Sequence, residues 1–414
     1  MLLLINHEGE DILDCHPSAS PGDVMVTNIN SAAPPFEDRF DELRAQFPIL
    51  GRKTYLNSNS LGALSRRSME ERSKFEELWN DLGASAWYEI WLAKLDEVRA
   101  MFGQTIGAEL PTIALMPSVS AALTTVSAAV LSHPKRGNRN KVVLTELDFP
   151  TVGHHFLSQK GNGLNVEIVP STDGVRVPLE AIKAAVDEKT ALLVTSHVLF
   201  TSGTIQDAAE LTRIAHASGA YIFLDAYQSN GQLAIDARGL GVDFLAGGAL
   251  KWLCGGPGMA YLYVRSDLSI DPVTLSWFGV ENQFGFDIRD VGVRTGARRF
   301  ELGTPATGAA YAAAGGLSIV LETGIDEIQA RNKALSEDLR NRLEAEGYSL
   351  HQSPDQTERS ALVLIEHPDA AGAVSGLAKQ GVIADHRGSL LRFSPHFYNC
   401  LEDNEHAVGV LADL

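Results

Sequence analysis

Residues 221–264 read YIFLDAYQSNGQLAIDARGLGVDFLAGGALKWLCGGPGMAYLYV and contain three apolar runs separated by polar or glycine-rich segments. Short apolar runs bounded by turn residues are typical of buried strands. The first run ends at Asp225, and Lys251 closely follows the second. Open α/β sheets place their ligands beyond the carboxyl ends of such strands. The stretch therefore predicts an α/β sheet with an acid and a base at its ligand-binding edge.

Similar apolar runs occur at 141–147, 164–170 and 191–200, and they also read as buried strands. Helical patterns lie between several of these runs, for example at 178–190 and at 208–219, the latter closed by a glycine. Repetition of strand and helix predicts a mainly parallel sheet that is covered by helices on both faces.

The 414 residues exceed the usual size of one domain and indicate a large domain with a smaller companion. Residues 1–50 are rich in Pro, Ser and Asp and predict a loosely ordered arm that leads into a helix, with 1–24 as its weakly ordered extension. We expect a large domain at 51–305 and a small C-terminal domain at 306–414. A long helical pattern at 325–347 predicts the bridge between them.

The charge balance is acidic, with 34 Lys and Arg against 52 Asp and Glu and a formal net charge of -18. Such a field repels polyanions, so nucleic acids and anionic membrane surfaces are not expected partners. We find no apolar run long enough to span a bilayer. The cysteines Cys15, Cys254 and Cys400 are far apart and form no CxxC pair, which argues against a disulfide framework and a zinc site. We expect a cytoplasmic protein.

Asp225 and Lys251 together indicate a specific chemistry. A buried carboxylate needs a cationic or protonated partner, and a desolvated lysine has a lowered pKa that makes its amine a nucleophile toward an aldehyde. Pyridoxal 5′-phosphate satisfies both groups, with the lysine as its Schiff base and the aspartate beside its pyridinium nitrogen. From the residues alone, a simple ion pair between Asp225 and Lys251 explains the pattern equally well.

Five separated motifs resemble the class V aminotransferase family of fold type I pyridoxal phosphate enzymes, which includes cysteine desulfurases, kynureninases and isopenicillin N epimerase. The stretch 224–264 resembles the cofactor core of the family. TYLNSNSLGAL at 54–64 and DFPT at 148–151 resemble kynureninase segments. RRFELGTP at 298–305 resembles a desulfurase segment, and LRFSPHFYN at 391–399 resembles the substrate-carboxylate segment of both groups.

The resemblance covers about residues 50–410 and implies a fold type I architecture. In that architecture a large domain holds a mainly parallel, seven-stranded sheet between helices, and a smaller α+β domain follows. The family's cofactor is pyridoxal 5′-phosphate, and its active unit is a homodimer whose subunits share the site.

Four residues would hold the cofactor ring by this resemblance. Lys251 would form the Schiff base and act as the catalytic base, and Asp225 would keep the ring nitrogen protonated. Gln228 would hydrogen-bond the phenolic oxygen, or else be a surface turn amide. Phe149 would stack on the ring, or else be an ordinary core phenylalanine.

Three further residues would hold the phosphate. Val119 and Ser120 lie in MPSVSAALTTV, at a turn that enters a helix of small residues, where free N–H groups and the helix dipole favour an anion. Ser120 could equally be a plain N-cap serine. Thr304 would add a hydroxyl from the partner subunit.

Five residues are candidates for substrate contact. Arg392 would bind the α-carboxylate with its planar fork, the alternative being a surface salt bridge. Asn59 and Ser60 would face the substrate or merely form a turn. Trp277 in SWFGV would contact the substrate side chain or be a buried loop aromatic, and His154 would be an acid or base or a structural histidine.

The departures from the family bear on the reaction. Cysteine desulfurases carry a nucleophilic cysteine shortly before the carboxylate arginine, and 379–393 contains none. Kynureninases carry a tyrosine immediately before the lysine and an aspartate after FPT, whereas this chain has Leu250 and Val152. The sequence therefore differs from both groups at positions specific to their reactions.

We expect a pyridoxal phosphate enzyme that acts on a small amino acid, as a kynureninase-like lyase that cleaves a C–C or C–heteroatom bond at Cβ. An aminotransferase or an amino-acid epimerase is the alternative, followed by a cysteine desulfurase. A regulatory protein that only binds the cofactor, or a nicotinamide-dependent dehydrogenase, is a third possibility, although no GxGxxG opens a helix after the first strand. No metal site is expected, because the adjacent His154 and His155 lack carboxylates at ligand spacing.

Overall fold

The computed structural model describes residues 35–134 and 137–414. The predicted weakly ordered extension at 1–24 lies outside this range. The helix expected at the end of the N-terminal arm is present as α1 (Phe36–Ala45), and its Phe36 and Leu43 are buried in the main core.

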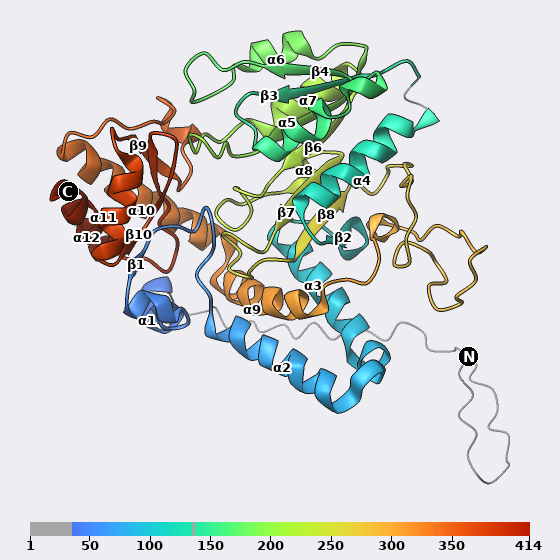
Figure 1. Cartoon of the computed structure of the whole chain (residues 1–414), viewed down its shortest axis with the longest axis horizontal. Helices are drawn as coiled ribbons and strands as arrows, with labels where there is room; N and C mark the ends of the chain where they lie inside the picture. The colour runs from blue at the N-terminus through green and yellow to red at the C-terminus, as the bar shows by residue number, and fades with distance from the viewer. Residues whose placement is uncertain (1–34, 135–136) are drawn as a thin grey trace. The chain divides into compact units, whose positions relative to one another are not determined.

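The central feature is a seven-stranded sheet with strand order β2-β8-β7-β6-β5-β3-β4 (Figure 1). The strands from β3 to β7 are parallel to their neighbours, whereas β8 runs antiparallel to both β2 and β7. This confirms the predicted mainly parallel sheet. Its strands are β2 (Ile113–Met116), β3 (Lys141–Thr145), β4 (Asn165–Val169), β5 (Thr190–Ser196), β6 (Tyr221–Asp225), β7 (Phe244–Gly248) and β8 (Ala260–Val264).

Alternation along the strands builds two cores, one on each face of the sheet. In β6, Ile222 and Leu224 belong to one hydrophobic cluster and Phe223 belongs to the other, because successive side chains point to opposite faces. Helices cover both faces (Figure 1). Besides α1, the α-helices that precede the C-terminal region in the described chain are α2 (Arg66–Leu82), α3 (Leu92–Thr105), α4 (Val119–Ser132), α5 (Pro150–Leu157), α6 (Leu179–Ala185), α7 (Ala208–Ala217) and α8 (Ala237–Leu240).

The six strands expected at 141–147, 164–170, 191–200 and within 221–264 are all present, as β3 to β8. One expectation about them is wrong. The run at 164–170 was expected to be buried, but β4 is an edge strand of the sheet and Ile168 is 41% exposed. The other edge strand, β2, is buried along its whole length, so β4 differs in that no other part of the described chain encloses it.

The C-terminal region contains the remaining helices and two small sheets. The long helix expected at 325–347 is α10, and strands β11, β12 and β9 form an antiparallel sheet. β1 (Thr54–Tyr55) pairs in parallel with β10, so a segment close to the N-terminus joins this region; the domain boundaries remain a prediction. The elements are α9 (Thr307–Thr323), α10 (Ile325–Ala345), β9 (Val363–Glu366), α11 (Ala370–Lys379), β10 (Val382–Ile383), β11 (Asp385–Arg387), β12 (Leu390–Phe393) and α12 (Leu401–Ala412).

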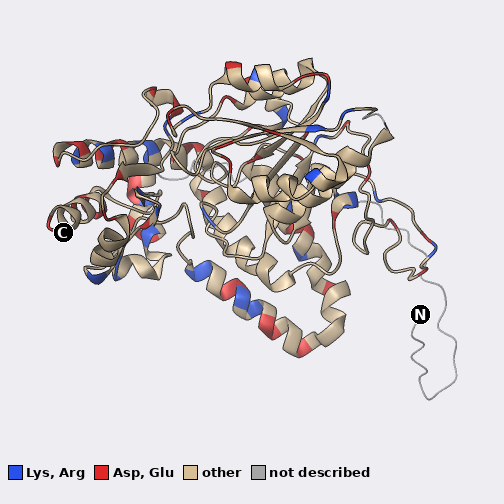
Figure 2. Ribbon diagram, turned by 45° about the horizontal axis from the view of Figure 1, so that its top comes forward, with Lys and Arg blue, Asp and Glu red and all other residues tan. Residues whose placement is uncertain are grey.

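Within the described residues, no single helix combines the length and the hydropathy of a membrane span, although α9 and α10, bent by 82° at their junction, pass the length and composition test as a pair. Most side chains of α9 are buried in the protein. On the exposed helix α2, Lys and Arg are interspersed with Asp and Glu (Figure 2).

Close backbone contacts fix the segment that carries Lys251. The N–H of Gly62 donates to the Leu250 carbonyl at 2.9 Å, and a Cβ on Gly62 would overlap the Lys251 carbonyl oxygen. On the other side, a Cβ on Gly316 of α9 would overlap the Cys254 carbonyl. These glycines bring the N-terminal segment and α9 against the two sides of the lysine loop.

We predict that Gly62→Ala lowers the free energy of unfolding by about 2 kcal/mol or more, because the added methyl group must displace the backbone at Lys251. Gly51→Ala is the matched control. No heavy atom lies within 4 Å of the position of its Cβ, and we expect a change of at most about 0.5 kcal/mol. Denaturant unfolding of both variants checks the prediction, and equal stability of the two would contradict it.

Candidate active site

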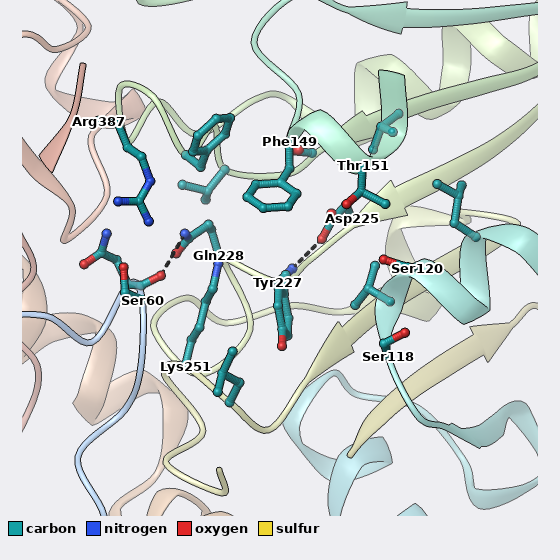
Figure 3. Close-up of a pocket in the computed structure, with 18 of the residues that line it drawn as sticks. Ser60, Ser118, Ser120, Phe149, Thr151, Asp225, Tyr227, Gln228, Lys251 and Arg387 are labelled. Atoms are coloured by element: carbon teal, nitrogen blue, oxygen red, sulfur yellow. Dashed lines mark hydrogen bonds between the residues drawn. The ribbon is translucent and has the colours of Figure 1, made fainter. Parts of the chain in front are cut away.

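A cavity of about 370 Å³ lies beyond the carboxyl ends of β5, β6 and β7 (Figure 3). Its walls come from distant parts of the sequence: the segment around Asn59, the first turns of α4 and α5, the lysine loop, and strands β11 and β12 of the C-terminal region. The cavity therefore lies at the carboxyl ends of the strands, where the sequence predicted a ligand-binding site.

Asp225 ends β6 and lies in the cavity wall with 8% of its surface exposed. One carboxylate oxygen accepts the N–H of Tyr227 at 2.8 Å (Figure 3). Burial raises the pKa of Asp225 to about 6, opposed by that hydrogen bond and by the positive charge of Lys251. The group is ionised at neutral pH and has room for a cationic partner.

Lys251 follows β7 and extends into the same cavity (Figure 3). Burial lowers its pKa to about 8; the Asp225 carboxylate opposes this shift, and Arg392 and Arg387 reinforce it. Among the described residues, no salt bridge within 4.0 Å joins Lys251 to Asp225, so the simple ion pair considered from the sequence does not form. The amine is poised as a nucleophile near neutral pH.

Tyr227 contacts both of these groups and was missed by the sequence analysis. The Lys251 Nζ atom lies 4.6 Å from the centroid of its ring, a cation–π distance, and its backbone N–H holds Asp225. Burial raises the pKa of the Tyr227 phenol to about 12, with Asp225 adding to the shift. A Cβ on Gly248 would overlap the ring, so a glycine is needed at the end of β7. The sequence could have indicated Tyr227 as a cavity residue, because it lies only two residues beyond Asp225.

Gln228 lines the cavity and is buried, which rules out the surface turn amide. Its Nε2 donates to the carbonyl of Asn59 at 3.0 Å, and its Oε1 accepts from Trp252 Nε1 at 3.0 Å. These contacts fix the amide plane. A primary amide has two N–H groups, so one donor remains for a ligand.

The N-terminus of α4 faces the cavity through Ser118, Val119 and Ser120. The N-cap is Ser118, whose hydroxyl accepts from the N–H of Ala121 at 3.1 Å, so Ser120 is not the N-cap serine considered from the sequence. The N–H groups of Val119 and Ser120 belong to the first helical turn and have no intrahelical partner. This arrangement suits a phosphate group.

Phe149 lines the cavity and is 45% exposed, so it is not an ordinary core phenylalanine. Its ring makes an edge contact with Phe200, with the centroids 5.3 Å apart. A planar ring placed between Phe149 and the β6 end would find the Asp225 carboxylate, the Lys251 amine and the α4 N-terminus around it. The residues present therefore fit pyridoxal 5′-phosphate.

Arg392 lies in the wall of the cavity but is tied to the protein. Its Nε and Nη2 donate to the two oxygens of Asp385 at 2.8 and 2.7 Å, and Nη1 donates to the Phe200 carbonyl at 3.0 Å. Its fork therefore binds a carboxylate of the chain itself. The salt bridge is buried, unlike the surface pair considered as the alternative, and the expected free fork for a substrate is not found.

Arg387 is a cavity residue that the sequence analysis missed. It ends β11, and its guanidinium extends toward the cavity (Figure 3). Its side chain is half exposed, at 50%. The sequence spacing could have indicated Arg387, because Asp385 and Arg387 are two residues apart in a short strand and therefore lie on the same face of it.

Asn59 and Ser60 both line the cavity, as expected. The Asn59 Oδ1 atom accepts from the Ser394 hydroxyl at 2.7 Å, whereas its buried Nδ2 has no hydrogen-bond partner in the described part of the chain. The Ser60 hydroxyl contacts Asp385 and accepts from Arg392 Nη2 at 3.2 Å.

Three predicted residues lie outside the cavity of their own chain. His154 is exposed on α5, so the prediction that it contacts substrate is wrong for the pocket that this chain forms. The Trp277 indole donates to the Gln283 carbonyl at 2.5 Å and packs among Phe278, Phe284 and Phe286. Thr304 lines a separate pocket next to Pro117, and its predicted role lies in a partner's site.

Two cavity positions at which kynureninases carry polar side chains hold apolar side chains in this chain. Val152 and Leu250, which replace the aspartate and tyrosine of kynureninases, both line the cavity. Cys254 is buried, and burial raises the pKa of its thiol, as expected for a structural thiol. Neither cysteine in the described ranges lines the cavity, and the described residues hold no cluster of three metal-ligating side chains.

Solved structures share this fold over nearly the whole chain. An apo cysteine desulfurase from Thermococcus onnurineus NA1 aligns with a TM-score of 0.79 at 20% identity, covering 90% of this chain and 97% of that one. A C-DES variant with glycine covalently linked to its PLP cofactor aligns with a TM-score of 0.82 at 21% identity, covering 90% and 99%. These likenesses establish the fold type I architecture.

Sequence relatives cover the chain to a similar extent. A Bacillus subtilis (strain 168) protein named uncharacterized aminotransferase YcbU is 34% identical over 374 residues, which are 90% of this chain and 97% of the relative. A kynureninase from Geobacillus thermodenitrificans (strain NG80-2) is 29% identical, with 87% of each chain covered. Residues 55–401 match the model of the aminotransferase class-V family. The chain thus belongs to the aminotransferase class-V family, as its motifs indicated.

Proposed function

We propose that this protein is a pyridoxal 5′-phosphate enzyme that acts on a small amino acid. The observation that carries the proposal is the pair of Asp225 and Lys251 at the ends of neighbouring strands. Asp225 is buried and Lys251 is partly buried, both have pKa values shifted toward neutrality by desolvation, and no salt bridge within 4.0 Å joins them in the described part of the chain. Desolvated charges that are not paired with each other are costly, so a ligand that contacts both groups would be favoured.

Residues in the cavity of one chain would provide most of the contacts that the cofactor needs. Lys251 would hold it covalently, and Asp225 would bind the protonated ring nitrogen. The free N–H of Gln228 would reach the phenolic oxygen, Phe149 would cover one face of the ring, and the first turn of α4 would receive the phosphate. When bound, pyridoxal phosphate withdraws electrons from a bond at the substrate α-carbon.

Lys251 would also move a proton. Its amine lies in the cavity, and a pKa of about 8 would let it accept and return a proton at the substrate Cα near neutral pH. The apolar Leu250 and Val152 add no competing proton donor to the cavity wall.

We further propose that the reaction is cleavage at Cβ, as in kynureninases. The kynureninase relatives and the Asn59, Ser60 and Phe149 positions in the cavity support it. Transamination is the second candidate, supported by the relative that is named an aminotransferase, and epimerisation follows. A desulfurase mechanism finds no nucleophilic thiol in the cavity among residues 35–134 and 137–414, where neither Cys254 nor Cys400 lines it. A protein that binds the cofactor without turnover is the non-enzyme alternative.

A second copy of the chain would complete the site. Trp277 and Thr304 lie outside the cavity of their own chain. The segment after Trp277 exposes apolar side chains, with Phe286 at 67% and Ile288 at 90%. Exposed apolar groups of this kind mark contact surfaces. We propose a homodimer in which these residues reach the partner's cofactor site.

The reaction is tested by incubating the cofactor-loaded protein with individual L-amino acids, including kynurenine, with and without pyruvate as amino acceptor. Cβ cleavage predicts fragment formation without an acceptor, whereas transamination predicts amino-group transfer only with one. Lys251→Ala is the control that should abolish either product. A loaded protein that leaves every amino acid unchanged would favour the regulatory alternative.

The lysine electrostatics predict how cofactor attachment depends on pH. Only the neutral amine attacks an aldehyde, so the rate at which cofactor-free protein develops the visible absorption of bound pyridoxal phosphate should rise with pH and level off above about 8. Asp225 raises the pKa of Lys251, so Asp225→Asn should move this midpoint to lower pH. A midpoint near the ordinary lysine value in the unmodified protein would contradict the account.

A further inference from the structure

Asp148 is a buried carboxylate that the proposed function does not use. It does not line the cavity, and only 8% of its surface is exposed. Five hydrogen bonds converge on its two oxygens, and no salt bridge within 4.0 Å involves it in the described part of the chain. A buried charge without a cation is costly, so we asked what this charge does beside the cavity.

The five donors belong to the ends of two neighbouring parallel strands, β3 and β5. Oδ2 accepts from the N–H and the hydroxyl of Thr145, at 2.8 and 2.9 Å. Oδ1 accepts from the N–H and the hydroxyl of Ser196, at 2.7 and 2.9 Å, and from the Thr195 hydroxyl at 3.1 Å. A backbone N–H can only donate, and each oxygen receives one, so these contacts suit the ionised carboxylate.

The carboxylate lies between two parts of the cavity wall. Phe149 follows Asp148 directly, at the N-cap of α5, and like Asp225 it borders the cavity (Figure 3). Ser196 also lines the cavity, and its Cα is paired with that of Asp225 in the register of β5 and β6. Asp148 therefore fixes both the residue that precedes the Phe149 ring and the strand end beside the Asp225 carboxylate.

Two negative charges thus lie on neighbouring strand ends behind the cavity. The charge of Asp148 adds to burial in raising the pKa of Asp225, whereas the Tyr227 N–H and Lys251 oppose the shift. Two carboxylates that share a site disfavour each other's ionised form unless a cation lies near them. The proposed cofactor would bring such a cation, because its ring nitrogen carries a proton beside Asp225.

We infer that Asp148 is a positioning residue of the cofactor site, and that its charge acts together with that of Asp225 to favour a protonated ring nitrogen. The inference rests on the proposed function and extends it to a residue that touches neither the cofactor nor the substrate. A neutral acceptor at this position could still link β3 to β5, so the charge is what distinguishes this role from a structural one.

The test compares pyridoxal 5′-phosphate with 1-deazapyridoxal 5′-phosphate, in which a carbon atom replaces the ring nitrogen. Dissociation constants are measured by equilibrium dialysis of cofactor-free protein against each compound. We expect the unmodified protein to prefer pyridoxal 5′-phosphate. Asp148→Asn should lower this preference at least about fivefold, because one of the two negative charges that favour the protonated nitrogen is gone.

Two controls separate the charge from other effects. Phe149→Leu removes the stacking ring, and it should weaken both compounds by similar factors and leave their ratio unchanged. Asp369→Asn removes a carboxylate that accepts the Gly372 N–H at 2.8 Å at the N-cap of α11, and both dissociation constants should match those of the unmodified protein.

Thr145→Val is a milder variant that decides the matter if Asp148→Asn does not fold. It removes one hydroxyl donor from Asp148, has a similar shape, and leaves the hydrogen bond of the Thr145 N–H in place. A carboxylate with fewer donors takes up a proton more readily, so the preference for pyridoxal 5′-phosphate should fall in the same direction by a smaller factor.

The outcomes distinguish the inference from the proposed function. Equal weakening of both compounds in Asp148→Asn, or no change in either, would overturn the inference, as would an unchanged ratio in Thr145→Val. Equal binding of the two compounds by the unmodified protein would overturn the role proposed for Asp225 as well. An unmodified protein that binds neither compound would overturn the proposed function itself.

Discussion

The structure depends on keeping two buried opposite charges apart. Asp225 and Lys251 end neighbouring strands of one sheet, where the simplest outcome would be a direct ion pair. That pair is not formed; instead the N–H of Tyr227 donates to the carboxylate, and the lysine amine lies 4.6 Å from the centroid of the Tyr227 ring. Desolvation raises the pKa of Asp225 to about 6 and lowers the pKa of Lys251 to about 8. The cavity between the two groups has room for a ligand that contacts both.

The surrounding fold keeps this geometry in place. Gly62 allows the N-terminal segment to hydrogen-bond the Leu250 carbonyl, and His396 of the C-terminal region contacts the Trp252 carbonyl through Nε2 at 2.8 Å. The lysine loop is therefore held by segments from both ends of the described chain. The same C-terminal region contributes Arg387 and Arg392 to the cavity wall, and Asp385 holds the Arg392 fork, so a small antiparallel sheet forms part of the site at the edge of the large parallel sheet.

Much of the fold and part of the site could be predicted from the sequence. Strand ends are local features, so apolar runs located Asp225 and Lys251 at one edge of the sheet. Arg392 was interpreted as free because its pairing with Asp385 depends on the register of β11 and β12, which no local pattern specifies. His154 was placed in the site by its nearness to Phe149, but one helical turn directs the two side chains differently. Ser118 was missed as the N-cap because either serine fits the pattern.

The most direct measurement of the central claim is to identify the residue that carries the cofactor. The protein is loaded with pyridoxal 5′-phosphate, reduced with borohydride, digested and analysed by mass spectrometry. The account predicts a single pyridoxyl modification on the peptide that contains Lys251, and its loss together with the visible absorption in Lys251→Ala. Modification of a different lysine, or none in a protein that is fully folded, would contradict it.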